Sequence, residues 1–212
     1  MSEKFRNPTI FHSIGISRLR MTTDGDGITT LVGGVGCPLR CKYCLNPQCH
    51  GDVDKSYTVE ELFNVVKSDS LYFEATGGGV TFGGGEPLLQ AGFIREFIDF
   101  VRNDGHNWQF YIETSLAVEW TKVALLADEI DEWIVDLKDA DEWTYFAYTG
   151  MSGKTARDNL TRLAVICPEK IRVRLPLIPG FNSMESLDLS HNFVRGLGIG
   201  QVERFEYSVI HQ

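Results

Sequence analysis

Residues 36–46 read GCPLRCKYCLN, and this stretch holds three of the five cysteines of the chain. The C-x3-C-x2-C spacing lets the thiolates of Cys37, Cys41 and Cys44 converge on one metal centre. Three protein ligands leave one coordination position open for a group that is not protein. An open position is typical of a centre that carries out chemistry rather than one that only stabilises a fold.

The composition indicates a globular protein of the cytoplasm. With 212 residues, of which 43% are hydrophobic and 23% charged, the chain is expected to form a single domain over residues 1–212. No apolar run is long enough to cross a membrane, and the N-terminus lacks the pattern of a secretory signal. In a reducing compartment the five cysteines favour metal ligation over disulfides. A net charge of −9 without a cluster of Lys and Arg argues against nucleic-acid binding.

The residues around the cysteine stretch predict alternating strands and helices. Residues 28–32 are rich in β-branched side chains, and the glycines that follow let the backbone bend into the cysteine loop. Thr58 and Glu61 form a capping-box pattern at the start of a helix. The predicted strands are residues 28–32, 78–82, 109–112, 132–136, 171–177 and 202–207. The predicted helices are residues 58–66, 88–102, 118–126, 142–163 with a break near Gly150, and 186–197.

This alternation predicts an α/β fold with a parallel sheet, because parallel neighbours need crossover connections. An open doubly wound sheet and an incomplete version of the eight-fold barrel both satisfy it. Chemically active residues cluster at the C-terminal ends of successive strands, where barrel enzymes build their sites. These residues are the cysteine loop, Gly84-Gly85-Glu86, Glu113-Thr114-Ser115, Asp136-Leu137-Lys138 and Arg174. We therefore expect a partial (β/α)6 barrel of the TIM type.

The cysteine loop, with the aromatic Tyr43 just before Cys44, looks like the signature of the radical S-adenosylmethionine enzymes. The resemblance implies one 4Fe-4S cluster on the three cysteines and S-adenosylmethionine on the iron that they leave free. Reduction of the cluster would then give a 5′-deoxyadenosyl radical, so the cofactor supplies the difficult chemistry. The block Gly84-Gly85-Glu86-Pro87 resembles the second motif of this superfamily, which contacts the methionyl amino group.

Within the superfamily, the chain is most similar to the activating enzymes of glycyl-radical enzymes, the pyruvate formate-lyase activase group. The similar blocks are residues 24–28, 36–41, 80–90, 136–138, 148–150 with 159–160, and Arg174 followed by 178–180, in the same order. The resemblance implies an oxygen-sensitive oxidoreductase of anaerobic metabolism that takes a hydrogen atom from a glycine of a partner glycyl-radical enzyme. It also implies a flavodoxin or ferredoxin as electron donor, and we expect a monomer without a membrane partner.

The same resemblance assigns roles to polar residues at the strand ends. Lys138 and Arg174 would hold polar groups of S-adenosylmethionine, and Tyr43 would lie beside this cofactor. Glu113, Thr114 and Asp136 correspond to positions that surround a monovalent cation in pyruvate formate-lyase activase. That family has Asp where this chain has Glu113, so the longer side chain could displace the cation or reach the cofactor directly.

Two departures from the family are visible. Only a short loop separates Cys44 from the helix at Thr58, so we expect no ferredoxin-like insert and no auxiliary clusters. The family usually carries a Tyr-His pair after the last strand, whereas residues 205–212 here read FEYSVIHQ, in which His211 is the candidate for that histidine.

Three alternatives stay open. The first is a radical enzyme that acts on a small molecule, like the compact 7-carboxy-7-deazaguanine synthases. The second is a structural zinc site completed by Cys49 or His50. The third is a non-enzymatic metal-binding or electron-transfer module. Cys167 is interpreted as a small buried residue. Cys49 is interpreted as a bystander, with a thiol near the substrate opening as the alternative.

Overall fold

The computed structural model of the protein describes residues 9–21, 23–53 and 55–207. All strands of this part belong to one 8-stranded sheet with the order β3-β1-β2-β4-β5-β6-β7-β8. From β2 to β8 every pair of neighbours is parallel, whereas β1 pairs antiparallel with both β2 and β3. The strands are β1 (Phe11–Met21), β2 (Ile28–Gly34), β3 (Lys55–Tyr57), β4 (Gly79–Gly84), β5 (Gln109–Thr114), β6 (Glu132–Asp136), β7 (Ile171–Leu177) and β8 (Gln201–Glu206).

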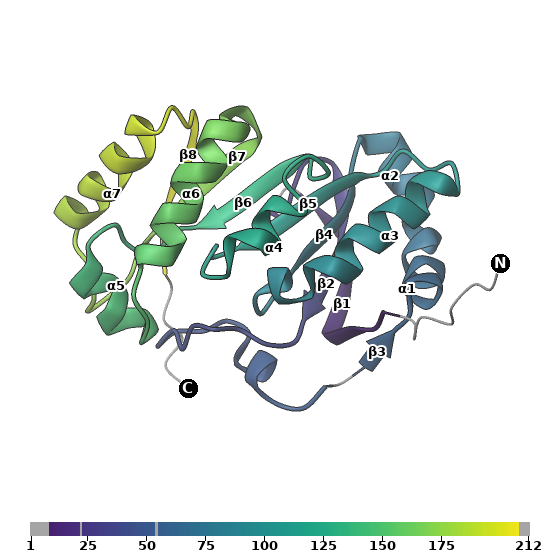
Figure 1. The fold of residues 1–212 in the computed structure, drawn as a ribbon, viewed down its shortest axis with the longest axis horizontal. Coiled ribbons are helices and arrows are strands. Elements are labelled where there is room, and N and C mark those ends of the chain that lie inside the picture. Colours follow the sequence, from purple (N-terminus) through teal and green to yellow (C-terminus); the bar gives the residue numbers. More distant parts are fainter. Residues whose placement is uncertain (1–8, 22, 54, 208–212) are drawn as a thin grey trace.

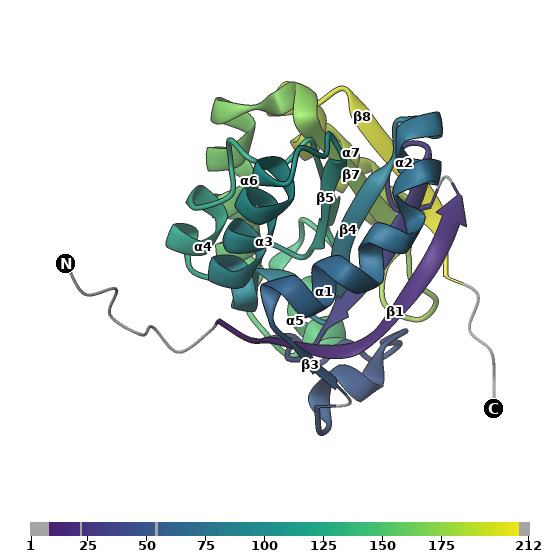
Figure 2. The same ribbon diagram turned by 90° about the vertical axis from the view of Figure 1, so that its right-hand side faces the viewer.

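The helices cover one face of this sheet (Figure 1). They are α1 (Val59–Val66), α2 (Ser70–Thr76), α3 (Ala91–Asn103), α4 (Trp120–Ala124), α5 (Glu142–Thr149), α6 (Lys154–Ile166) and α7 (Met184–Gly196). The sheet curves but does not close into a barrel, and Figure 2 shows β1 and β8 on the side away from most helices. None of the helices in the described ranges has both the length and the apolar character that crossing a membrane requires.

The predicted parallel strands are confirmed, with bounds that differ by only a few residues. The prediction missed α2 and the two antiparallel strands. β1 has bulges near Ser13 and between Ser17 and Arg20, and its second half is mostly exposed, so its side chains do not alternate regularly. β3 is only three residues long. The predicted break at Gly150 is confirmed, because this glycine adopts a left-handed conformation (φ 74°) that ends α5.

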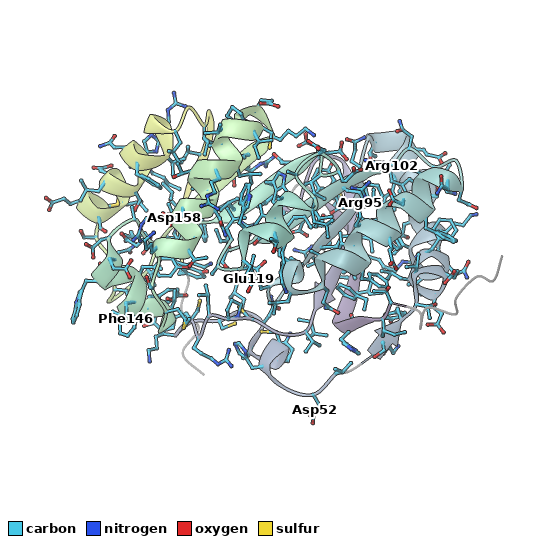
Figure 3. All side chains as sticks on the ribbon, viewed as in Figure 1. Asp52, Arg95, Arg102, Glu119, Phe146 and Asp158 are labelled. Atoms are coloured by element: carbon cyan, nitrogen blue, oxygen red, sulfur yellow. The ribbon has the colours of Figure 1, made fainter. Side chains whose placement is uncertain are left out.

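The two faces of the sheet differ in character, because side chains of a strand alternate between them. The face toward the helices carries apolar residues such as Phe82, Phe110 and Trp133, which pack against α3 and its neighbours in the hydrophobic core. Charged side chains such as Arg95 and Arg102 lie on the outer side of α3 (Figure 3). The opposite face of the sheet is polar. It carries Glu113, Glu132, Asp136, Arg172 and Arg174 from the central parallel strands.

The contact between β4 and β5 leaves no room for a side chain at Gly79. A Cβ atom at this position would lie 1.9 Å from the carbonyl oxygen of Gln109. We expect Gly79→Ala to lower the free energy of unfolding by about 2–3 kcal/mol, because the strands must separate to admit the methyl group. Urea unfolding of the metal-free protein measures this effect.

Gly92 provides the matched control for this experiment. It lies in the first turn of α3, and a Cβ atom there would meet nothing within 4 Å. Gly92→Ala should leave stability unchanged or raise it by up to ~1 kcal/mol. Equal destabilisation by the two substitutions would contradict the tight β4–β5 contact.

Candidate functional site

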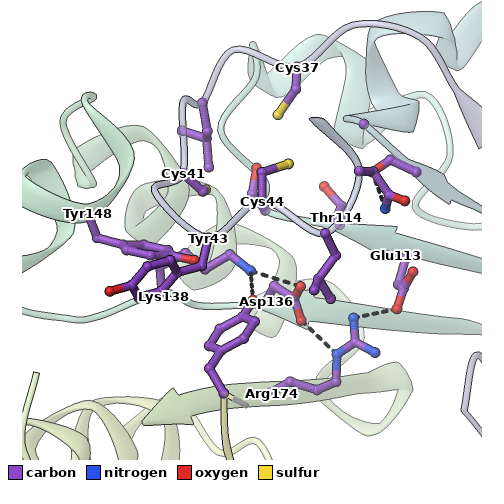
Figure 4. A pocket seen from close by; sticks show the side chains of 17 residues that line it. Cys37, Cys41, Tyr43, Cys44, Glu113, Thr114, Asp136, Lys138, Tyr148 and Arg174 are labelled. Atoms are coloured by element: carbon purple, nitrogen blue, oxygen red, sulfur yellow. Dashed lines mark hydrogen bonds and ion pairs between the residues drawn. The ribbon is translucent and has the colours of Figure 1, made fainter. Parts of the chain in front are cut away.

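One pocket lies at the C-terminal ends of the parallel strands, beside the cysteine loop (Figure 4). Its cavity volume is about 150 Å³, and it opens to solvent. The lining residues are Cys37, Leu39, Cys41, Tyr43, Cys44, Leu45, Asn46, Gly84, Gly85, Glu113, Thr114, Ser115, Asp136, Lys138, Tyr148, Arg174 and Tyr207. All the predicted site residues except Glu86 are among them. The structure therefore brings together residues that are far apart in the sequence.

The cysteine loop is fixed by backbone hydrogen bonds on two sides. On one side, the amides of Arg40 and Lys42 donate to the carbonyl oxygens of Thr149 (2.8 Å) and Tyr148 (3.1 Å) at the end of α5. These carbonyls would otherwise lack partners, because the last turn of a helix leaves them free. On the other side, the amide of Glu86 donates to the carbonyl oxygen of Gly36 (2.7 Å). The loop is therefore held between α5 and the end of β4.

Gly84 and Gly85 are required by the packing of this loop. A Cβ atom on Gly85 would lie 2.2 Å from the carbonyl oxygen of Gly36, and one on Gly84 would lie 2.7 Å from the Cα atom of Gly33. Gly84 also has a positive φ of 91°. The glycines thus let β4 and the start of the cysteine loop approach each other closely.

Cys37, Cys41 and Cys44 are half-buried free thiols that surround one end of the pocket (Figure 4). Burial raises the pKa of Cys37 to about 12 and also raises the pKa of Cys41. In the metal-free protein these two thiols are therefore protonated at neutral pH. A thiophilic metal centre would displace the protons and bind the thiolates, which makes this donor set suitable for an iron–sulfur cluster.

Glu86 is 1% exposed and lies behind the pocket wall rather than in its lining. Its carboxylate accepts hydrogen bonds from the hydroxyl of Thr114 (2.7 Å), from the hydroxyl and amide of Ser115 (2.7 and 3.0 Å), and from the amide of Leu88 (3.4 Å). Burial raises the pKa of Glu86, although these hydrogen bonds oppose the shift. The side chain thus connects the end of β4 to the end of β5.

A network of four charges forms the floor of the pocket (Figure 4). The guanidinium of Arg174 contacts the carboxylate of Glu113 and donates to Asp136 Oδ1 at 2.6 Å. Lys138 Nζ donates to the other oxygen of Asp136 at 3.0 Å. Burial would raise the pKa of Asp136, but Lys138 and Arg174 hold it below its ordinary value. The two carboxylates and two cations balance, so the floor has no net charge.

Aromatic side chains form the wall opposite Glu113. The ring of Tyr43 lies 6.2 Å from that of Tyr148 and 5.7 Å from that of Phe181, between ring centroids. Tyr43 also donates its hydroxyl to the carbonyl oxygen of Pro179 at 3.4 Å, so it links the cysteine loop to the segment after β7. Tyr207 lies next to Tyr148 and contacts Lys138 at 3.4 Å.

The sequence prediction did not name all of these residues as part of the site. Ser115 is among the strand-end residues of the sequence analysis but was given no role, and Tyr148 lies in one of the blocks that are similar to the activase family. Asn46 ends the cysteine stretch but was given no role, and Tyr207 had no signal because only the folded chain brings it to the pocket. His211 lies outside the described residues.

The remaining cysteines differ in their surroundings. Cys167 is buried at the end of α6, where its thiol donates to the carbonyl oxygen of Leu163 at 3.8 Å. Cys49 is also buried, but the structure places it beside the cysteine loop. Its sulfur, the sulfur of Cys44 and a ring nitrogen of His50 all lie within 4.8 Å of one another.

The comparisons with known proteins agree on one family. A sequence profile of the Radical SAM superfamily matches residues 31–189. The chain is 36% identical over 141 residues to the (2S)-3-sulfopropanediol dehydratase activating enzyme of Klebsiella oxytoca, a match that covers 66% of this chain and 44% of that protein. It is 29% identical over 198 residues to the pyruvate formate-lyase-activating enzyme of Staphylococcus aureus strain USA300, which covers 90% of this chain and 78% of that protein.

Solved structures share the fold. Streptococcus suis SuiB bound to S-adenosylmethionine superposes with a TM-score of 0.64 and 16% identity over 82% of this chain and 39% of that chain. QueE from Escherichia coli superposes with a TM-score of 0.50 and 13% identity over 93% of this chain and 95% of that chain. The open, curved parallel sheet is therefore a partial barrel of the kind found in these proteins, as predicted.

The hydrogen bonds of Glu86 lead to a prediction about stability. In Glu86→Gln an amide NH2 replaces one carboxylate oxygen and faces a backbone N–H donor that it cannot satisfy. We expect the free energy of unfolding of the metal-free protein to fall by about 2–3 kcal/mol in urea. Glu96→Gln is the control, because Glu96 is exposed on α3. A loss no larger than that of the control would contradict the role of Glu86 as the connection between β4 and β5.

Proposed function

The chain belongs to the radical SAM superfamily, and from this membership we propose that it is an activating enzyme that takes a hydrogen atom from a glycine of a partner glycyl-radical enzyme. The observation that carries the proposal is the pocket, in which three free cysteines face a balanced set of charges at the strand ends. Both curated relatives described above are activating enzymes. The chain spans less than half of one of them and about three quarters of the other. The glycyl-radical enzyme as its partner is therefore proposed here and is not taken over from these relatives.

Cys37, Cys41 and Cys44 would hold the 4Fe-4S cluster of the superfamily. When bound, the reduced cluster supplies the electron that breaks a carbon–sulfur bond of S-adenosylmethionine, and the radical that results removes hydrogen from the substrate. The chain supplies three thiolates and a loop that is fixed from both sides. Because α5 and the end of β4 hold this loop, its backbone has a defined position before a cluster binds.

The pocket offers complementary groups for S-adenosylmethionine, whose methionyl part carries both an ammonium and a carboxylate. Lys138 and Arg174 would contact the carboxylate or hydroxyl groups, while Glu113 and Asp136 would face the positive charge. Gly84 and Gly85 would form the backbone wall beside the methionyl group, and Thr114 would add a hydroxyl. The rings of Tyr43 and Tyr148 offer flat apolar surfaces for the adenine. Glu86 would act by positioning Thr114 and Ser115 rather than by contact.

The open edge of the sheet supports a protein substrate. In the part of the chain that the structure describes, β8 is the last strand of the sheet, and most of its residues are exposed. An extended loop of a partner could enter the pocket from this side. We include in the proposal a single catalytic domain, a monomeric form, a cytoplasmic location and a flavodoxin or ferredoxin as electron donor.

The activase function predicts a protein radical that can be observed directly. The iron-reconstituted protein, incubated without oxygen with S-adenosylmethionine, a reductant and a glycyl-radical enzyme encoded beside it, should produce the doublet of a glycyl radical in the EPR spectrum. Cys41→Ser should abolish both the doublet and 5′-deoxyadenosine formation.

The outcomes separate the competing functions. Formation of 5′-deoxyadenosine without a glycyl signal with any such partner would favour the small-molecule alternative. Iron binding without cofactor cleavage would instead favour an electron-transfer module, and would overturn the enzyme proposal.

The charge network leads to a proposal about the monovalent cation. The resemblance places such an ion beside Glu113, Thr114 and Asp136, but here the guanidinium of Arg174 contacts both carboxylates. We propose that Arg174 takes the place of this ion. Binding of S-adenosylmethionine should then be insensitive to the exchange of K⁺ or Na⁺ for choline at constant ionic strength.

The variant Arg174→Gln tests this proposal, because it leaves Glu113 and Asp136 without their shared cation. We expect this variant to bind S-adenosylmethionine about tenfold more weakly in choline chloride, corresponding to ~1.4 kcal/mol, and to recover part of the loss in KCl. Equilibrium dialysis of the reconstituted protein measures both values. A wild-type protein that needs K⁺ would show that the cation site is retained.

A further inference from the structure

We infer that Cys44, Cys49 and His50 bind one zinc ion in the cluster-free protein, and that this ion and the cluster exclude each other because both need Cys44. The exclusion rests on the proposed role of Cys44 as a cluster ligand, whereas the zinc site itself does not. The site would take a thiophilic divalent metal ion. The site adjoins the pocket and shares only Cys44 with it, since neither Cys49 nor His50 is a lining residue.

The three ligand atoms are already close together. The sulfurs of Cys44 and Cys49 and a ring nitrogen of His50 lie within 4.8 Å of one another. Ligand atoms on one tetrahedral zinc ion lie roughly 3.6 Å apart, as follows from Zn–S and Zn–N bonds of about 2.3 and 2.0 Å. Small side-chain rotations would therefore close the group around an ion. Two sulfurs and one imidazole are a donor set that zinc prefers.

The backbone holds Cys49 and His50 in place. They lie at the end of a short 3₁₀ turn, Pro47–His50, in which the amide of Cys49 donates to the carbonyl oxygen of Asn46 at 3.0 Å. The carbonyl oxygen of Cys49 in turn accepts from the amide of Gly36 at 2.8 Å. Asn46 is fixed as well, because its side-chain amide donates to the carbonyl oxygen of Gly84 at 3.0 Å. Cys49 thus has a defined position next to the cysteine loop.

The His50 lone pair that a metal ion would use is engaged by Arg40. Arg40 Nη1 lies 2.8 Å from His50 Nδ1, and because a guanidinium can only donate, the imidazole accepts this hydrogen bond. Arg40 Nη1 also donates to the carbonyl oxygens of Cys37 (2.8 Å) and Leu39 (3.1 Å). The guanidinium can therefore release the imidazole and keep other acceptors.

The binding step is an exchange of protons for metal. Burial raises the pKa of Cys49 to about 11, so its thiol is protonated in the metal-free protein. Zn²⁺ binds cysteine as the thiolate, so the proton of the Cys49 thiol is released to solvent on binding, and no electron is transferred. Water completes the coordination, because no further Cys, His, Asp or Glu of the described residues joins the group.

The consequence concerns the assembly of the cluster. Zinc binds to sites of this kind more tightly than Fe²⁺ does. An ion at Cys44 would leave only Cys37 and Cys41 for iron, so the zinc form could not accept a complete cluster. The cysteine loop would thus have two exclusive metal states that share one ligand.

Titration of the reduced, metal-free protein with Co²⁺ under anaerobic conditions tests the site directly. We expect binding of one Co²⁺ with thiolate charge-transfer bands in the near ultraviolet. Cys49→Ser and His50→Ala should each weaken binding at least ~10-fold, whereas Cys37→Ser should not. The opposite pattern, with loss in Cys37→Ser and retention in Cys49→Ser, would place the ion on the cluster cysteines and overturn the inference.

A second measurement tests the exclusion. Preloading with one equivalent of Zn²⁺ should slow cluster reconstitution, followed by absorbance and iron content, and Cys49→Ser should remove this effect. Circular dichroism checks that the variant is folded. Zinc inhibition that persists in Cys49→Ser would contradict the inference. Cleavage of S-adenosylmethionine by reconstituted Cys49→Ser is measured in parallel, so failure of the zinc site and failure of the proposed enzyme function are distinguishable.

Discussion

The guanidinium of Arg174, held between the carboxylates of Glu113 and Asp136, is the interaction on which the pocket depends. The three side chains come from adjacent parallel strands, and the register places Asp136 directly opposite Arg174. Burying any one of these charges alone would be costly. Removing one member of a buried ion pair is therefore far more destabilising than replacing the whole pair by apolar residues. Because the positive and negative groups balance, the sheet face opposite the helices can carry these charged side chains.

The cysteine loop depends on contacts with two distant segments rather than on its own sequence. The end of α5 accepts two of its backbone amides, and the glycines of β4 allow the approach of its first residues. This arrangement explains why the blocks at residues 84–86 and 148–150 accompany the cysteines. They position the loop, and the carboxylate of Glu86 fixes the neighbouring strand end. The motifs are thus one hydrogen-bonded unit at the C-terminal edge of the sheet.

Much of the fold could be predicted from the sequence, because the parallel strands are apolar segments bounded by glycines and separated by amphipathic helices. The capping box was equally visible, and Thr58 and Glu61 make both of its hydrogen bonds. β1 could not be predicted, because its bulges disturb the alternation that identifies a strand. The position of the Glu86 side chain could not be predicted from the sequence either. A motif indicates that a carboxylate matters, but whether it faces a ligand or a neighbouring strand depends on packing.

The sheet face opposite the helices is polar outside the pocket as well, and the sequence pattern of β7 indicates this. Arg172 and Arg174 alternate along β7, and Arg172 contacts Glu132 at 2.8 Å and Glu203 at 3.1 Å. The same face therefore carries two successive ion clusters, one at the pocket floor and one further from the strand ends. Only the first is reachable by a ligand through the pocket. A ligand that carries both charges can exchange these ion pairs for its own, so its binding leaves no buried charge without a partner.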